Sequence, residues 1–386
     1  MSQIDETNMG LQLVNIPYDS QLKQKQNQIE NLFKENIKGT YKVNEIIGMS
    51  NPDHYRNKVH VVIGSNKKGK IIGGMYQENT HRIIPIESSV AHDKKADEII
   101  NSIKKILTDF KVSAYNEDSK SGLVRHILVR RAIKTNQTML IIVTSSDMFP
   151  GRNNIVKTIR KVHPEINTII QNINSRSTSV ILGDKERVLF GKGFITDILC
   201  GLKFNISPKS FYQVNPIQTE ILYDKAIECA NLTSNDVILD AYCGIGTIGL
   251  IASKKVKEVI GVEVNNDAVK DAIKNARNNN IGNTRFYCAD ASLFMIDLIQ
   301  KDKKVDVVFL DPPRSGCDDD FLRSLIKLNA DKVIYISCNP ETLVRDLKLL
   351  VNHNYKLKYI QPVDMFPHTV HVESIILMTY CGLQGE

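Results

Sequence analysis

Cysteine is absent from the first 199 residues, and the seven cysteines that follow are scattered along the rest of the chain. They are Cys200, Cys229, Cys243, Cys288, Cys317, Cys338 and Cys381. None belongs to a Cys-x-x-Cys pair, so the spacing supports neither a zinc site nor an iron–sulfur cluster. A disulfide framework is also excluded for a cytosolic chain of this size. We therefore expect reduced thiols and no bound metal.

Long apolar runs are missing as well. No stretch of about 18 apolar residues is present, which excludes an ordinary transmembrane helix. The segment Met1–Glu6 has neither the basic part nor the apolar part of a secretory signal. Hydrophobic residues make up 42% and charged residues 24% of the 386 residues, as in globular proteins. We expect a monomeric cytoplasmic protein of at least two domains, without a membrane partner.

The net charge of +7 is distributed unevenly. Residues 1–120 sum to +2, residues 121–210 to +9 and residues 211–386 to −4. A charge run is commonly a solvated surface, but a basic region beside a slightly acidic domain also suits a phosphate-binding surface. RNA or another polyanion is thus one candidate partner. The basic residues of the middle region include Arg125, Arg130, Arg131, Lys134, Arg152, Lys157, Arg160 and Lys161.

The hydrophobic pattern predicts two domains of mixed α/β structure. In residues 1–204 we predict helices at 21–36 (exposed), 94–110 and 153–172, a hairpin of strands 59–63 and 71–75, and strands 127–130 and 139–143. In residues 205–386 helices and strands alternate, which predicts a mostly parallel, doubly wound, Rossmann-like sheet. There we predict helices at 215–230, 247–254, 266–280, 291–301, 318–328 and 340–352, and strands at 237–242, 259–264, 284–288, 305–310, 333–337, 355–361 and 372–380.

A glycine-rich turn follows the first strand of the second domain. Gly244, Gly246 and Gly249 match the pattern Gly-x-Gly-x-x-Gly between a strand and a helix. Glycines allow a tight turn there, and an acid after the next strand, here Glu263, binds ribose hydroxyls. The pattern predicts a cofactor that carries adenosine. It leaves a nicotinamide dinucleotide and S-adenosylmethionine as alternatives.

A proline pair follows the fourth strand, in the sequence Asp311-Pro312-Pro313-Arg314. Two prolines keep the backbone extended and rigid, so the preceding side chain projects into the ligand cleft. The segment resembles the Asx-Pro-Pro signature of methyltransferases that act on nucleobases. Dehydrogenases have no comparable use for it, which favours S-adenosylmethionine over a nicotinamide cofactor.

A cysteine and a glutamate lie at the ends of two of the last predicted strands. Cys338 ends a strand, and Asn339 and Pro340 suit the start of a helix. The helix dipole should lower the pKa of this thiol, which makes Cys338 the best candidate for a nucleophile. Glu373 begins the final apolar strand, where partial burial should raise its pKa as a general base requires. No ligand spacing or neighbouring acid in the sequence marks His368 and His371 as bases, and we expect structural roles for them.

Together these segments resemble the RNA 5-methyluridine methyltransferase family, which methylates carbon 5 of uridine. The resemblance is specific over residues 205–386 and weaker towards the N-terminus. Its motifs are closest to those of the members that act on 23S ribosomal RNA. The chain departs from many of those members, because it has neither the N-terminal β-barrel nor the four cysteines of an iron–sulfur cluster. The segments that carry the resemblance are Phe211–Asn215, Asp240–Gly246, Asp311–Gly316, Ser337–Thr342 and Phe366–Glu373.

The resemblance implies a role for each matching residue. Cys338 is expected to add to carbon 6 of the uracil and Glu373 to remove the proton from carbon 5. Gln213 and Asp311 are also expected next to the uracil. In the first domain Arg125, Arg130 and Arg131 are candidate RNA contacts. The expected contacts of S-adenosylmethionine are Gln213, Tyr242, Gly244, Gly246, Glu263, Asp290 and Asp311.

The predicted function is therefore methylation of a uridine in structured RNA. Ribosomal RNA is the favoured substrate and transfer RNA is the alternative. A nicotinamide oxidoreductase is a further alternative from a different class, but it leaves Asp311 and Cys338 unexplained.

Overall fold

The computed structural model describes residues 6–177 and 179–382, and the chain divides into two compact units. Unit 1 contains the residues up to Gly10 together with Asp53–Ile198 and Asn205–Lys209. Unit 2 contains Leu11–Pro52, Leu199–Phe204 and the residues from Ser210 onward. The strands β9 (Ile195–Leu199) and β10 (Leu202–Ile206) form a separate two-stranded sheet.

Unit 1 is built on a seven-stranded sheet with the strand order β4-β3-β2-β5-β6-β7-β8. Neighbouring strands are antiparallel except β6 and β7, which are parallel and joined by α3. One face of the sheet packs against α2 and α3 through an apolar core. The elements are η1 (Glu6–Met9), β2 (Lys58–Ser65), β3 (Ile71–Tyr76), β4 (Ile83–Pro85), α2 (Lys94–Asp109), β5 (Val124–Ala132), β6 (Gln137–Thr144), α3 (Arg152–Val162), β7 (Ile166–Ile173) and β8 (Lys185–Phe190).

One predicted helix of unit 1 is wrong in its second half. The helix expected at 153–172 ends at Val162, and β7 begins at Ile166. Pro164 lies between them, and proline disfavours helical backbone at the residue before it. The residues that follow are mostly β-branched and pair with β6 in parallel. The predicted hairpin is confirmed as the antiparallel pair β2 and β3.

Unit 2 contains the predicted doubly wound sheet. Its eight strands have the order β1-β16-β17-β15-β14-β11-β12-β13. Strands β11 to β15 are parallel, whereas β17 runs antiparallel to both β15 and β16. The strands are β1 (Lys42–Val43), β11 (Val237–Ala241), β12 (Glu258–Glu263), β13 (Thr284–Cys288), β14 (Val307–Leu310), β15 (Lys332–Ser337), β16 (Tyr355–Val363) and β17 (Glu373–Tyr380).

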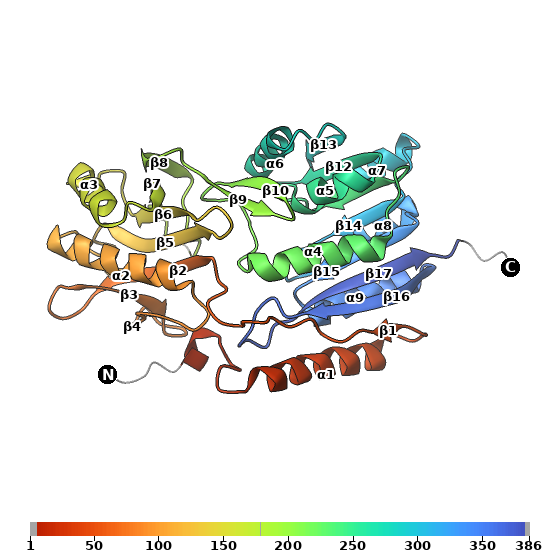
Figure 1. Ribbon diagram of the computed structural model, residues 1–386, viewed down its shortest axis with the longest axis horizontal. Coiled ribbons are helices and arrows are strands. Elements are labelled where there is room, and N and C mark those ends of the chain that lie inside the picture. The colour runs from red at the N-terminus through yellow and green to blue at the C-terminus, as the bar shows by residue number, and fades with distance from the viewer. Residues whose placement is uncertain (1–5, 178, 383–386) are drawn as a thin grey trace. The chain divides into compact units, whose positions relative to one another are not determined.

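Helices cover both faces of this sheet (Figure 1). The apolar core on one face is shared by α1, α7, α8 and α9, and α4, α5 and α6 lie on the other face. The chain changes direction between β11 and β14, so the ends of these strands form the switch point where such sheets bind ligands. The helices are α1 (Tyr18–Asn36), α4 (Pro216–Ala230), α5 (Thr247–Ala252), η2 (Ser253–Lys255), α6 (Asn266–Asn278), α7 (Ala291–Gln300), α8 (Asp319–Leu328) and α9 (Pro340–Val351).

The N-terminal segment is placed differently from the expected division at residue 204. Leu11–Pro52 belongs to unit 2, where β1 extends the sheet in parallel to β16. Helix α1 is also not exposed all round, because Ile29 and Phe33 lie in the unit 2 core. The same face of α1 carries the buried polar residues Gln21 and Lys25. They interrupt the apolar pattern, so the sequence alone does not show that this face is buried.

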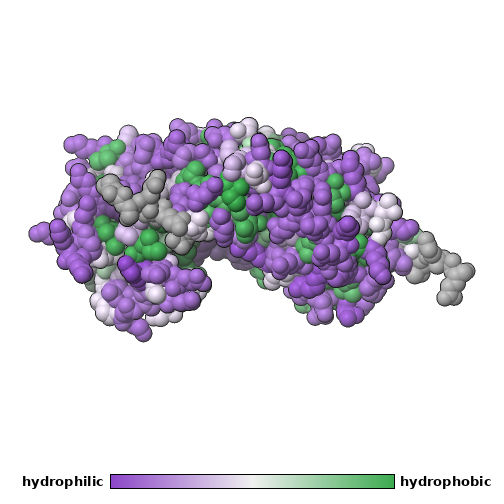
Figure 2. All heavy atoms as spheres, turned by 90° about the horizontal axis from the view of Figure 1, so that it is seen from below, coloured by the Kyte–Doolittle hydropathy of each residue, from purple (hydrophilic) through white to green (hydrophobic). Residues whose placement is uncertain are grey.

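The surface is predominantly polar on the face drawn in Figure 2, where hydrophobic residues occur in small groups between hydrophilic ones. Among the residues that the structure describes, no helix is long and apolar enough to cross a membrane. Nor do the described histidine, cysteine, aspartate and glutamate side chains form a group of three or more that could hold a metal ion.

Candidate active site

The predicted site residues of unit 2 lie at one edge of its sheet. Asp311 follows β14 and Cys338 follows β15, two adjacent parallel strands. Glu373 is the first residue of β17, which runs in the opposite direction, so its start lies at the same edge. The last pair between β15 and β17 joins Ser337 to Ser374. The strand pairing therefore places Cys338 beside Glu373.

Glu373 is almost completely buried, with 3% of its surface exposed. Its Oε2 atom has no hydrogen-bond partner within the described part of the chain. Burial raises the pKa of Glu373 well above its usual value, Asp311 raises it further, and Arg314 lowers it. A buried carboxyl group with an unpartnered oxygen can accept a proton from a ligand at this edge.

Asp311 is held at the same point by the proline pair. Burial raises its pKa to about 7, within the range in which a carboxyl group can both donate and accept protons. The turn that follows is fixed, because Asn339 Nδ2 and Thr342 Oγ1 donate to the Arg314 carbonyl oxygen at 3.1 and 3.2 Å. These bonds join the Asp311–Arg314 segment to the start of α9, next to Cys338.

Cys338 is half-buried and precedes Asn339, the N-cap of α9. The expectation that the helix dipole lowers its pKa is wrong. Burial raises the pKa of Cys338 to about 11, Glu373 and Asp311 raise it as well, and the Arg314 guanidinium opposes them. Loss of water around the half-buried thiol is thus the main reason why the thiolate is disfavoured, and the two carboxyl groups add to it.

The glycine-rich turn between β11 and α5 has the expected geometry. Gly244 and Gly246 have φ angles of 55° and 81°, in the left-handed region that favours glycine. Glu263, at the end of β12, accepts hydrogen bonds from Gly244 N at 3.1 Å and from Asn265 N at 2.8 Å. The carboxylate and the turn are thus held together at the end of adjacent strands.

Three further predicted residues lie around this turn. Tyr242 has a φ angle of 62°, unusual for a residue with a side chain, and its ring packs on Phe321 at 5.1 Å between centroids. Gln213 is buried, with 7% of its surface exposed, two residues before Asn215, the N-cap of α4. Asp290 is the N-cap of α7, where its side chain accepts from Leu293 N at 3.0 Å.

Two residues of the site were not assigned a role from the sequence. Tyr223, on α4, hydrogen-bonds to Gln213 and Thr247, and burial and the charge of Asp311 raise its pKa. No sequence motif identifies Tyr223 as a site residue, because only the packing of α4 brings it to the site. Arg314 influences the pKa of both Cys338 and Glu373. The position of Arg314 directly after the proline pair is the sequence signal that could have identified it as a site residue.

The three candidate arginines belong to β5 of unit 1, and two of them are buried. Arg125 pairs with Glu117 at 2.6 Å and donates to the carbonyl oxygens of residues 174 and 176. Burial lowers the pKa of Arg130 to about 10. Arg131 pairs with Asp93 at 3.2 Å. The internal bonds of Arg125 hold its guanidinium within unit 1.

Comparisons with known proteins give one consistent picture. A family model described as tRNA (uracil-5-)-methyltransferase matches residues 17–380. An uncharacterized RNA methyltransferase of Clostridium tetani (strain Massachusetts / E88) is 44% identical over 373 residues, which cover 97% of this chain and 81% of that protein. Another RNA methyltransferase, from Oceanobacillus iheyensis, is 41% identical over 372 residues, or 96% of this chain and 81% of that protein.

A solved structure is similar over nearly the whole chain. It is the crystal structure of Pyrococcus abyssi tRNA (uracil-54, C5)-methyltransferase in complex with S-adenosyl-L-homocysteine. The TM-score is 0.80 at 28% sequence identity, and the match covers 98% of this chain and 88% of that chain.

Proposed function

The chain belongs to the tRNA (uracil-5-)-methyltransferase family, and we propose on this basis that it methylates carbon 5 of a uridine through a covalent adduct with Cys338. Membership of this family confirms the predicted enzyme class, RNA methyltransferase, and S-adenosylmethionine as the methyl donor. It excludes the nicotinamide oxidoreductase alternative. The cytoplasmic location stays a prediction.

The residues at the switch point fit S-adenosylmethionine. A Cβ atom at Gly244 would have nothing within 4 Å, so the turn is open to a ligand on that side. Glu263 ends its strand at the position suited to ribose hydroxyls. When bound, the cofactor supplies an electrophilic methyl group. The further proposed cofactor contacts are Gln213, Tyr242, Gly246, Asp290 and Asp311.

The proposed reaction uses the two acids and the thiol in turn. Carbon 5 of uracil is a weak nucleophile. Addition of the Cys338 thiolate, formed when the thiol loses its proton, to carbon 6 produces an enolate that makes carbon 5 reactive. Asp311 and Gln213 hold the polar edge of the ring as charge develops on it. After methylation Glu373 takes the proton from carbon 5, the carbon–sulfur bond breaks, and the Cys338 thiolate is released.

The two neighbouring carboxyl groups, those of Asp311 and Glu373, suit this sequence of steps. Two carboxyl groups close together disfavour double ionisation, so one of them keeps a proton near neutral pH. The charge of Asp311 raises the pKa of Glu373, so Glu373 is the acid that keeps this proton in the free protein, and it must release the proton before it can accept the one from carbon 5. The observation that carries the proposal is the unpartnered, buried Oε2 of Glu373 beside Cys338.

A trapping experiment tests the proposal. RNA with 5-fluorouridine at the target should form a stable complex with the protein, since fluorine cannot be removed as a proton. We expect a slow protein–RNA band on a denaturing gel that requires S-adenosylmethionine. Cys338→Ala should abolish the band, whereas Cys381→Ala, at an exposed cysteine, should leave it unchanged. A band that survives Cys338→Ala would overturn the assignment of the nucleophile.

For the RNA we propose 23S ribosomal RNA, because the motifs resemble those members most. Transfer RNA is the second candidate, favoured by the similarity to the Pyrococcus abyssi tRNA enzyme. Mass mapping of 5-methyluridine in both RNA classes, from strains with and without the protein, separates them. Loss of a methylated uridine from 23S ribosomal RNA supports the first candidate, and loss from transfer RNA alone supports the second.

For the RNA-facing surface we propose helix α3 of unit 1. Its last turn is basic and its first turn carries no acidic residue. Lys157, Arg160 and Lys161 are exposed on it, and the Arg160 guanidinium stacks on the Phe190 ring at 3.9 Å. Exposed cations bind phosphates at a smaller desolvation cost than the buried arginines of β5.

A further inference from the structure

The loop that leads into Glu373 is buried along most of its length. It comprises residues 364–372 and connects β16 to β17, whose residues Val363 and Glu373 are paired. Asp364, His368 and Thr369 are among its buried polar residues. Connecting segments normally lie on the surface, because buried polar groups need partners. The partners of this loop therefore decide how Glu373 is held.

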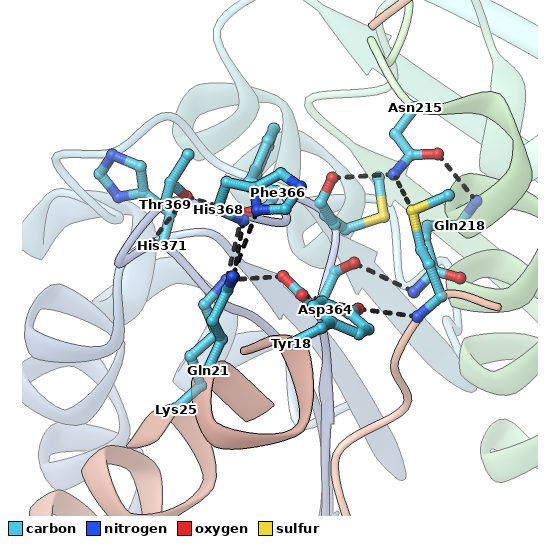
Figure 3. A network of polar contacts seen from close by, with 12 residues as sticks. Tyr18, Gln21, Lys25, Asn215, Gln218, Asp364, Phe366, His368, Thr369 and His371 are labelled. Carbon is cyan, nitrogen blue, oxygen red and sulfur yellow. Dashed lines mark hydrogen bonds and ion pairs between the residues drawn. The ribbon is translucent and has the colours of Figure 1, made fainter. Parts of the chain in front are cut away.

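Helix α1 supplies the first set of partners (Figure 3). Lys25 Nζ pairs with Asp364 Oδ1 at 2.6 Å and donates to the Phe366 carbonyl oxygen at 3.1 Å. Tyr18 Oη donates to Asp364 Oδ2 at 2.9 Å. Only 1% of the Lys25 side chain and none of the Asp364 side chain is exposed. The ion pair is thus an internal contact between segments 339 residues apart.

Gln21, one turn before Lys25, holds the middle of the loop. Its Oε1 accepts from His368 N at 2.9 Å, and its Nε2 lies 3.2 Å from His368 Nδ1. His368 has a φ angle of 68°, a left-handed conformation that is unfavourable for a residue with a side chain. Gln21 therefore bonds to both the backbone and the ring of a residue whose conformation must be imposed by its surroundings.

Helix α4 supplies the second set of partners. Gln218 Nε2 donates to the Asp364 carbonyl oxygen and Asn215 Nδ2 to the Met365 carbonyl oxygen, both at 3.0 Å. Asn215 is the N-cap of α4 and lies two residues after Gln213. One loop thus joins α1 to two parts of the candidate active site, the base Glu373 and the uracil contact Gln213.

We propose that Gln21 and Lys25 are positioning residues, which hold the loop 364–372 so that Glu373 can reach the proton on carbon 5. The inference rests on the proposed role of Glu373 as the base. A buried ion pair contributes little net stability compared with apolar side chains of similar volume, so stability alone does not account for its presence. A displacement of about 1 Å, by contrast, can slow a positioned proton transfer by up to roughly 100-fold.

Substitutions on the two faces of α1 test the inference. Gln21→Met removes the bonds to His368 and leaves the ion pair intact. Lys25→Met with Asp364→Leu replaces the whole ion pair, so no buried charge is left unpaired and we expect the protein to fold. The matched controls are Lys23→Met and Gln24→Met, which make the same changes on the exposed face of the helix.

The measurement is a single turnover on RNA that contains ordinary uridine, with unfolding temperature and S-adenosylmethionine binding measured alongside. In the Gln21 and Lys25/Asp364 variants we expect normal methyl transfer but release of Cys338 slowed by roughly 10- to 100-fold. The methylated protein–RNA adduct should then accumulate on a denaturing gel. The control variants should behave as the unaltered protein.

The outcomes separate this inference from the proposed function. If the unaltered protein gives no adduct even with 5-fluorouridine RNA, the proposed function fails. If that adduct forms but both variants release Cys338 as fast as the controls, the positioning role fails. If only the Lys25/Asp364 double variant releases Cys338 as fast as the controls, the ion pair does not position the loop and the role of Lys25 fails.

Discussion

Cys338 and Glu373 lie beside each other because the strands that carry them run in opposite directions. The same proximity makes ionisation of the thiol costly, since a thiolate next to carboxyl groups is disfavoured. Arg314 is the group whose charge lowers the pKa of both residues. The reactivity of the site therefore depends on the balance between two acids and one exposed guanidinium.

Neutralising Arg314 should slow the formation of the covalent adduct. Arg314→Gln removes the charge that lowers the pKa of Cys338, so the pKa should rise above about 11 and the thiolate fraction should fall. We expect an adduct rate several-fold below that of the unaltered protein at pH 7. Below the pKa the rate should increase with pH in both proteins. Time courses with 5-fluorouridine RNA at pH 7, 8 and 9 measure this.

Arg323→Gln, at an exposed arginine of α8, is the control for the loss of one positive charge. Equal rates for Arg314→Gln and Arg323→Gln would show that Arg314 does not act on the thiol. A rate independent of pH in the unaltered protein would show that thiol ionisation does not limit the addition.

Replacement of the base should stop the reaction after methyl transfer. Glu373→Gln keeps the shape of the side chain but cannot take the proton from carbon 5, so the bond to Cys338 should persist. We expect a methylated protein–RNA band on a denaturing gel with ordinary uridine RNA. The band should vanish when Cys338→Ala is added. Glu341→Gln, at an exposed residue of α9, should turn over normally.

If Glu373→Gln binds RNA and S-adenosylmethionine but gives no such band, another group removes the proton. His371 is then the next candidate, because it lies two residues before Glu373 and is half-buried.

At the level of secondary-structure elements, the packing of α5 on the sheet depends on Gly249. A Cβ atom there would lie 2.9 Å from both Asp240 Oδ2 and Val259 Cγ1. Gly249 N also donates to Asp240 Oδ2 at 2.8 Å, so the helix and β11 are joined at this point. The third glycine of the pattern thus serves the contact between helix and strand.

Gly249→Ala should move α5 and weaken cofactor binding. Overpacking of this kind costs about 1–3 kcal/mol of stability. We expect a lower unfolding temperature and a higher dissociation constant for S-adenosylmethionine, measured by thermal unfolding and calorimetry. Gly282→Ala, where a Cβ atom would meet nothing within 4 Å, should change neither. Normal binding by Gly249→Ala would contradict the packing argument.

At the level of the whole molecule, the uneven charge of the sequence bears on RNA binding. Lys157→Gln with Lys161→Gln removes two exposed charges from α3. Each lost phosphate contact lowers the slope of log K against log salt by about 0.7 to 0.9, so the slope should fall by about 1 to 2. Lys254→Gln with Lys255→Gln makes the same change of charge on exposed residues of unit 2. Filter binding over a range of salt concentrations compares them, and equal slopes would remove α3 from the RNA surface.

The sequence by itself determined the elements of unit 2 and the positions of its chemistry. Apolar runs separated by glycine, proline and capping residues predicted the strand Thr284–Cys288 with its observed bounds and the helices of unit 2 to within a few residues. These signals are local, so they can be read without the fold. Because parallel strands end at one edge, residues directly after them, such as Asp311 and Cys338, were expected to lie together.

Only the tertiary structure decided which charges are buried and with what partners. The pairing of Lys25 with Asp364 and of Arg125 with Glu117 cannot be read from the chain, because each depends on how separate segments pack. The pKa of Cys338 was predicted in the wrong direction for the same reason. The helix start that favours the thiolate is local, whereas the burial that raises the pKa of Cys338, and the nearby Glu373 and Asp311 that raise it as well, depend on the strand order and packing of the sheet.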